Sequence, residues 1–171
     1  MIELRDVVVA YESRVILDSI NLTIDDGETL VILGGSGSGK STLLRLLIGL
    51  QRPTSGQIIV DGTDITTLSE DEFNTVRRKM GMVFQYSALF DSMSVGENVA
   101  FGLRQHTDLG DDEIRRIVAE RLDWVGLKGY ESYMPNELSG GMKKRVSLAR
   151  AIALDPSLIL YDEPSSGLDP I

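Results

Sequence analysis

The spacing of apolar residues at the start of the chain predicts strands. Residues 2–11 and 15–24 are rich in β-branched residues that partly alternate with polar ones, which is typical of half-buried strands. Residues 28–33 form a continuous apolar run behind the turn Asp26-Gly27, which predicts a buried strand. Residues 57–60 predict another short strand. We expect the early strands to form a small antiparallel sheet.

Helical spacing dominates the middle of the chain. Ser69 and Glu72, and again Ser94 and Glu97, have the three-residue spacing of a capping box, which marks the start of a helix. Apolar residues recur at a period of 3.6 through 114–125, which predicts a further helix. These patterns therefore predict a helical segment over residues 86–138.

Two apolar strands of the second half lead into polar residues. Residues 81–84 predict a strand that ends at Gln85, and residues 157–161 predict a buried strand that ends at Asp162 and Glu163. Between them, residues 143–153 have an apolar face and predict a helix.

The stretch behind residues 28–33 fits the phosphate-binding pattern G-x-x-x-x-G-K-[ST] and leads into a predicted helix over 43–48. Its residues are Gly34, Gly35, Ser36, Gly37, Ser38, Gly39, Lys40, Ser41 and Thr42. Glycines let backbone N–H groups curl around an anion, and the helix N-terminus adds partial positive charge. Lys40 is expected to reach the β- and γ-phosphates, and the Ser41 hydroxyl to hold Mg²⁺. The alternative is a flexible Gly/Ser turn.

Composition narrows the classes of partner. The 171 residues are 42% hydrophobic and 25% charged, as expected of one globular domain. The net charge of −9 argues against a nucleic-acid-binding face and against docking on anionic lipid. The chain has no cysteine, no apolar run long enough to span a membrane, and no apolar leader at its start. We therefore expect any membrane association to depend on another protein.

Five motifs in this order resemble the ATPase domain of ABC transporters. They are the phosphate loop, Gln85, Leu138-Ser139-Gly140-Gly141, residues 158–163, and Ser166-Gly167-Leu168-Asp169. The resemblance covers essentially the whole chain. It implies an α/β P-loop NTPase with a RecA-like core, an N-terminal antiparallel β part and an inserted helical subdomain. The core and β part are expected at 1–85 and 139–171, and the helical subdomain at 86–138, within one nucleotide-binding domain spanning 1–171.

The resemblance also implies roles in binding ATP and Mg²⁺ and in hydrolysis. Asp162 is expected to hold Mg²⁺, since hard carboxylate oxygens suit that ion. Glu163 is expected to polarise the attacking water, and Gln85 to reach Mg²⁺ or the water. Tyr11 is expected to stack on adenine, although a core or rim tyrosine is an alternative. Gln85 has the alternative of an ordinary polar residue at a strand end.

Ser139, Gly140 and Gly141 open a helix whose N-terminus is an anion site. By resemblance they contact the γ-phosphate bound by a second subunit, which implies a head-to-tail homodimer that sandwiches ATP. Asp169 is expected at the seam of that dimer. Met142 departs from the usual Gln of this motif, which removes a polar side chain but no backbone donor.

The resemblance predicts further chain beyond Ile171. Family members carry a switch histidine some thirty residues after the Asp-Glu pair, whereas the single histidine here, His106, lies before it. We expect His106 to be a solvated residue near a helix end. We also expect the 171 residues to be a C-terminally incomplete fragment, which puts hydrolysis by this stretch alone in doubt, but not ATP binding.

Residues 84–101, with 103–107 and the 138–142 motif, are similar to the Mla-type ATPases of phospholipid trafficking between bacterial membranes. This implies a permease in the inner membrane, a peripheral position on its cytoplasmic face, and lipid-binding partner proteins. The apolar residues Leu89, Phe90, Met93 and Val95 suggest that 86–95 receives the permease. The alternative, that these four residues belong to the core of the helical subdomain, explains their apolar character equally well.

Three other functions stay open at this point. One is the ATPase of an ABC importer for another small solute. A second is a soluble ABC-type machine that acts on DNA or ribosomes, but the interval between the phosphate loop and Ser139 shows no sustained heptads and the chain shows one domain only. The third is a nucleotide-binding regulatory module without turnover, against which Glu163 argues.

Overall fold

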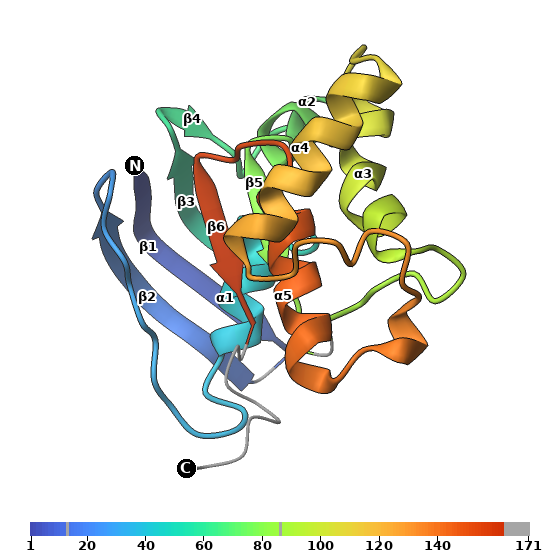
Figure 1. The fold of residues 1–171 in the computed structure, drawn as a ribbon. Helices are drawn as coiled ribbons and strands as arrows, with labels where there is room; N and C mark the ends of the chain where they lie inside the picture. Colours follow the sequence, from blue (N-terminus) through green and yellow to red (C-terminus); the bar gives the residue numbers. More distant parts are fainter. Residues whose placement is uncertain (13, 86, 163–171) are drawn as a thin grey trace. The chain divides into compact units, whose positions relative to one another are not determined.

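The computed structural model describes residues 1–12, 14–85 and 87–162 (Figure 1). The chain divides into two units, Met1–Arg77 and Arg78–Ile171. Each unit contains a small sheet and helices, as the sequence predicts for an α/β protein.

The first unit is built on a four-stranded antiparallel sheet. Its strands are β1 (Ile2–Tyr11), β2 (Arg14–Ile24), β3 (Ser55–Val60) and β4 (Thr63–Asp64), in the order β2-β1-β3-β4. Alternate side chains of β1 are buried, namely Ile2, Leu4, Val7 and Val9. The predicted antiparallel sheet is confirmed, with β4 as an added short edge.

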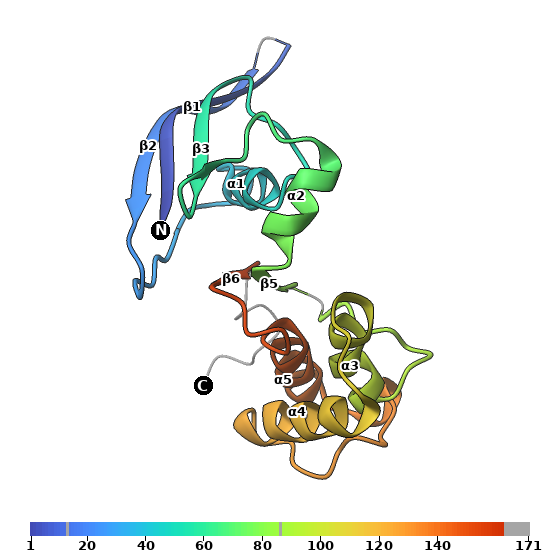
Figure 2. The same cartoon turned by 90° about the horizontal axis from the view of Figure 1, so that it is seen from above.

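Helices α1 (Lys40–Leu47) and α2 (Glu70–Arg77) lie on one side of this sheet (Figure 2). Gly49 follows the C-cap residue of α1, Ile48, and its φ of 71° is readily adopted by glycine. A Cβ on Gly49 would lie 2.6 Å from the Phe73 ring, so a larger residue would force α2 away. The glycine therefore both ends α1 and lets α2 approach it.

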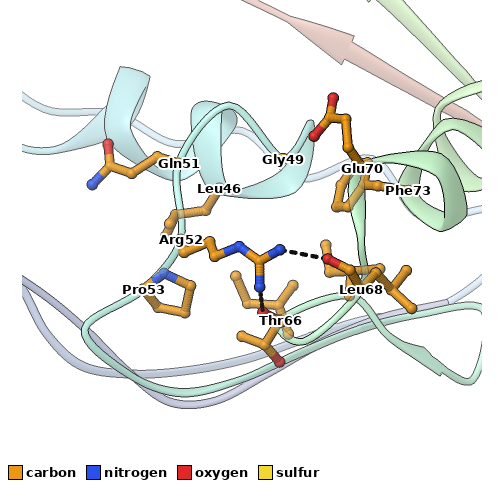
Figure 3. Close-up of a pocket in the computed structure, with 11 residues that line it drawn as sticks. Leu46, Gly49, Gln51, Arg52, Pro53, Thr66, Leu68, Glu70 and Phe73 are labelled. Atoms are coloured by element: carbon orange, nitrogen blue, oxygen red, sulfur yellow. Dashed lines mark hydrogen bonds between the residues drawn. The ribbon is translucent and has the colours of Figure 1, made fainter.

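A small hollow lies behind the C-terminal end of α1 (Figure 3). Arg52 spans it and donates hydrogen bonds to the carbonyls of Thr66 and Leu68. Arg77 stacks over the Phe73 ring and donates to the carbonyl of Ile48, which belongs to the last turn of α1. These contacts fix α1 at the end opposite to the phosphate loop.

The predicted buried strand over residues 28–33 is wrong. The described sheet of the first unit does not include these residues, and they have no regular secondary structure. The side chains of Val31 and Leu33 are 70% and 88% exposed. An apolar run forms a strand only if a neighbouring strand pairs with its backbone N–H and C=O groups. The sequence pattern does not reveal whether such a neighbour exists.

The second unit contains the parallel pair β5 (Met80–Val83) and β6 (Leu158–Tyr161). Helix α5 (Gly140–Ala151) passes so close to β5 that a Cβ on Gly81 would lie 2.5 Å from the Ala151 carbonyl. The predicted buried strand forms as β6, but only Leu160 is buried, at 7% exposed, whereas Tyr161 is 43% exposed. The described sheet of this unit has only two strands, so it covers little of β6.

Helices α3 (Val95–His106), α4 (Asp111–Trp124) and α5 share one apolar core (Figures 1 and 2). A short 3-10 turn, η1 (Pro135–Glu137), precedes α5. His106 is exposed at the end of α3, as expected. The subdomain boundaries at 86 and 138 stay a prediction. In the described part of the chain, every helix is too short or too polar to cross a membrane.

Candidate nucleotide-binding site

At two positions of the phosphate loop, Gly34 and Gly39, a Cβ would collide with neighbouring atoms. Its five residues before the N-cap of α1 are all exposed: Gly34, Gly35, Ser36, Gly37 and Ser38. A Cβ on Gly39, which has φ 95°, would lie 2.7 Å from the Leu17 Cδ2 atom and 3.3 Å from the Ile16 carbonyl oxygen. A Cβ on Gly34 would lie 2.6 Å from the Ser38 hydroxyl oxygen. The loop is therefore tightly folded, and it presents backbone rather than side chains.

Lys40 is already held across this loop. Its ammonium donates hydrogen bonds to the carbonyl of Gly34 at 2.7 Å and to that of Gly35 at 3.0 Å. The first turn of α1 continues with Ser41 and Thr42, and within the described residues no side chain caps the helix at Gly39. The loop thus carries the lysine charge at Gly34 and Gly35 and leads into a helix N-terminus without a side-chain cap, and both features suit a phosphate.

Tyr11 lies in the same unit as the loop. It ends β1, pairs with Arg14 of β2, and its side chain is 53% exposed. Two residues further along β2, Ile16 and Leu17 contact the position of Gly39. The hairpin therefore exposes the Tyr11 ring, which rules out a core tyrosine. A rim tyrosine and a stacking surface for adenine both fit this exposure.

Gln85 and Asp162 lie together at one edge of the second unit. Val83 pairs with Tyr161 in the parallel β5–β6 register, and the Asp162 N–H donates to the Val83 carbonyl at 3.0 Å. The carboxyl ends of both strands meet at this edge, so an amide and a carboxylate follow neighbouring strands. Each residue follows a strand, as the sequence predicts, and their predicted role at Mg²⁺ stays a prediction.

Ser139 caps α5 and still has a donor to offer. Its hydroxyl oxygen accepts a hydrogen bond from the Met142 N–H at 3.3 Å. A hydroxyl that accepts one hydrogen bond keeps its own proton to donate. Ser139 and Gly140 are exposed, and Gly141 is half-buried. Met142 packs against the core of α3, α4 and α5, which explains how an apolar residue is accommodated there.

The predicted site residues fall into two groups. The phosphate loop and Tyr11 belong to the first unit, and the second unit contributes Gln85, Asp162 and Ser139-Gly140-Gly141. Glu163 and Ser166-Gly167-Leu168-Asp169 lie outside the described residues.

Sequence reasoning missed two residues that fix the segment after Gln85. Asn98 is fully buried and bonds to the backbone of Phe90, and the Arg150 guanidinium bonds to the carbonyls of Ser87 and Ala88. Asn98 stands within the apolar stripe of Val95 and Val99. A polar residue on such a stripe is the signal that could have identified it.

Comparison with known proteins decides the family. A family model described as ABC transporter matches residues 17–166. The chain belongs to the ABC transporter family. The predicted resemblance, based on motifs spread over the chain, is confirmed.

This ABC transporter chain has similar relatives with two different names. It is 50% identical over 171 residues to the intermembrane phospholipid transport system ATP-binding protein MlaF of Haemophilus influenzae, covering 100% of this chain and 65% of MlaF. It is 51% identical over 170 residues to the probable ribonucleotide transport ATP-binding protein mkl of Mycobacterium bovis, covering 99% of this chain and 47% of mkl. The chain thus spans roughly half to two thirds of the length of these relatives.

A solved structure confirms the fold of an ABC cassette. The dimeric post-hydrolysis structure of the ATP-binding cassette MJ0796, bound to ADP and Pi, matches with a TM-score of 0.89 and 36% identity. The match covers 99% of this chain and 76% of that one. The predicted class, an α/β P-loop cassette with an antiparallel β part and helices, is therefore correct.

Proposed function

We propose that this chain is the nucleotide-binding part of an ATPase that powers a separate membrane permease. The observation that carries the proposal is the phosphate loop, where the Lys40 ammonium bonds to Gly34 and Gly35 beside the start of α1. Both similar relatives are named as ATP-binding proteins, and the solved cassette contains ADP and Pi. The nucleotide is therefore proposed as ATP.

Each part of ATP has a partner in this proposal. The phosphate loop from Gly34 to Thr42 surrounds the phosphates, and Lys40 balances the charge of the β- and γ-phosphates. The exposed ring of Tyr11 stacks on adenine, which requires only an aromatic face.

The residues present suit Mg²⁺. The Gln85 amide and the Asp162 carboxylate follow adjacent strand ends, and Ser41 offers a hydroxyl in the first turn of α1. All three provide oxygen, which is the ligand that Mg²⁺ prefers. When bound, the ion neutralises charge on the phosphates.

Glu163 is proposed as the base for hydrolysis. A water oxygen attacks the γ-phosphorus, the bond from that phosphorus to the ADP oxygen breaks, and the water proton passes to the Glu163 carboxylate. The Gln85 amide oxygen orients the water. Glu163 follows Asp162 directly in the chain.

We also propose a homodimer that sandwiches ATP. The exposed start of α5, with a spare hydroxyl donor on Ser139 and backbone N–H groups at Gly140 and Gly141, suits a γ-phosphate bound by a second copy. Asp169 is proposed at the seam between the copies. MJ0796 was solved as a dimer, which supports this arrangement.

Phospholipid transport between bacterial membranes is the proposed task. The identity to MlaF supports it, and the name of mkl keeps another small solute as the alternative. The permease would hold the chain on the cytoplasmic face of the inner membrane, with lipid-binding proteins as further partners. We propose no nucleic-acid partner and no direct membrane insertion.

Phe90 remains the candidate for the permease surface. Leu89 and Val95 pack in the core of α3, α4 and α5, so they support the alternative that this segment is internal. The Phe90 side chain is 41% exposed and rests on Phe101, with 4.8 Å between ring centroids. Within the segment 86–95, we therefore assign permease contact to the exposed face of Phe90.

The nucleotide assignment is tested by equilibrium ATP binding to the full-length protein and to Lys40→Ala. We expect Lys40→Ala to weaken ATP binding at least about tenfold, since a charge-assisted contact to the phosphates is worth more than about 1.4 kcal/mol. Arg45→Ala, an exposed cation of the same helix, is the control and should bind normally. Equal affinity of wild type and Lys40→Ala would refute the phosphate-loop assignment.

The transport assignment is tested by purification from membranes. A tagged, full-length Glu163→Gln form with ATP is expected to carry a multi-span permease and phospholipid, identified by mass spectrometry. Phe90→Glu should lose the permease while remaining folded. If the permease instead co-purifies with a binding protein for another solute, the proposed substrate becomes that solute and not phospholipid. Ribosomal proteins or DNA without a permease would reject transport altogether.

A further inference from the structure

One arginine of helix α5 holds the segment that follows Gln85. Arg150 lies in the last turn of α5, and its guanidinium is largely buried against residues 87–90. One end of the guanidinium donates to the Ala88 carbonyl at 2.8 Å, and the other donates to the Ser87 carbonyl at 3.1 Å. Its carbon also lies 5.6 Å from the centre of the Phe90 ring. A single side chain thus contacts three residues of this segment.

The backbone of this segment is strained where Arg150 holds it. Ser87 and Ala88 have φ values of 63° and 45°, in the left-handed region that residues with a Cβ adopt only when their surroundings hold them there. Their two carbonyls face one planar guanidinium, whose fork of donors has a fixed geometry. Burial lowers the pKa of Arg150 through desolvation.

Asn98 fixes the other end of the same segment to α3. Its side-chain oxygen accepts from the Phe90 N–H at 2.8 Å, and its amide nitrogen donates to the carbonyls of Phe90 and Met93. Asn98 is fully buried, so these contacts have no water as a substitute. Residues 87–93 are therefore held between α3 and α5.

Helix α5 connects the Arg150 contacts to Ser139 at its other end. Its N-cap is Ser139 and its last turn contains Arg150, which lies about 16 Å further along a rigid helix. A displacement of the Ser139 end is therefore expected to reach residues 87–90 through Arg150. These residues follow Gln85 and include Phe90, the proposed permease contact.

We propose that Arg150 is the positioning residue that links the Ser139-Gly140-Gly141 end of α5 to residues 87–90. The link rests on the proposed function, because it is ATP at the Ser139 end that would move α5. Arg150 itself contacts neither the nucleotide nor the reacting water. It sets where the segment between Gln85 and the permease contact lies, and makes that position depend on ATP.

The test is hydrogen–deuterium exchange of residues 87–94 in the full-length protein, with Arg150→Lys as the main variant. Lysine keeps the charge and most of the stem, but it lacks the fork that spans two carbonyls. We expect exchange at 87–90 to become at least about tenfold faster without nucleotide, and helix α4 to be unchanged. Arg150→Met, which also lacks the charge, should exchange at least as fast. Arg145→Lys, at an exposed position of the same helix, should exchange like wild type.

The second readout is the effect of ATP. In the wild type, ATP is expected to change the exchange rate of 87–94; in Arg150→Lys that change should be lost while the dissociation constant for ATP stays within about twofold. Unchanged exchange in both Arg150 variants would overturn the proposed contact. Faster exchange with the ATP effect intact would overturn the link and leave Arg150 a purely structural residue. A wild type that binds no ATP would overturn the proposed function and the link together, while the nucleotide-free comparison would still decide whether Arg150 holds the segment.

Discussion

At the scale of single residues, the phosphate loop depends on glycine for steric reasons. Gly39 combines a left-handed backbone with a close approach to Leu17 and to the Ile16 carbonyl, whereas Gly35 has open space where a Cβ would stand. Gly39 is a fixed glycine of the motif, whereas Gly35 stands at a position where the motif accepts any residue. The structure therefore shows a steric requirement for glycine at Gly39 and none at Gly35.

Gly39→Ala is predicted to destabilise the protein by more than about 2 kcal/mol, because the added Cβ is strained and meets Leu17. Gly35→Ala is the matched control, with an expected change within about 0.5 kcal/mol. Urea unfolding of both variants measures the difference. Equal stabilities would mean that the loop has room at Gly39 after all.

The sequence predicts which residues carry chemical groups for the site better than it predicts which residues hold the surrounding backbone in place. Lys40 and Ser41 are predicted by the phosphate-binding motif, and Asp162 by its place at the end of an apolar strand. Arg150 is not predicted, since its two acceptors are backbone carbonyls some sixty residues away and leave no pattern in the sequence.

At the scale of elements, local signals predict helix starts well. The box of Ser94 and Glu97 caps α3, and Ser69 and Glu72 form the same contacts before α2. The pattern over 28–33 failed as a strand because a strand, unlike a helix, finds its hydrogen bonds in another segment. The predicted helices needed no such partner.

These capping boxes predict a loss of stability in acid. The Ser94 N–H and hydroxyl lower the pKa of Glu97, and the Ser69 hydroxyl and N–H lower the pKa of Glu72. A carboxyl whose pKa is lowered by folding stabilises the fold above its unfolded value of 4.5, and the stabilisation is lost as pH falls through the folded value.

Urea unfolding at about pH 6 and about pH 3 measures this loss. A double variant with Glu72→Gln and Glu97→Gln keeps an acceptor oxygen at each cap without a titrating group. It is predicted to lose less stability between the two pH values than the wild type. An identical loss in both proteins would show that the caps contribute nothing to the acid dependence.

At the scale of the whole molecule, the chain carries the parts of an ABC cassette within 171 residues and spans 65% of the MlaF relative. The order of motifs was enough to predict the family, because five separate motifs agree. The partner permease and the solute are properties of an assembly, so they stay proposals.

The proposed dimer makes a prediction of its own. Full-length Glu163→Gln is expected to double its mass with ATP and to stay a monomer with ADP, because only ATP offers a γ-phosphate to Ser139 of the second copy. Light scattering measures the mass, with Lys40→Ala in the same background as the control that should remain monomeric. An equal mass with ATP and with ADP would reject the proposed dimer that sandwiches ATP.

Phosphate release from ATP by the full-length protein tests the central claim most directly, with wild type and Glu163→Gln measured side by side. We predict steady release by the wild type in the presence of Mg²⁺. Release by Glu163→Gln should be slower by at least about a hundredfold, since a general base typically contributes that much. No release by a wild type that binds ATP, or equal release by the two proteins, would contradict the account of this chain as part of an ATPase.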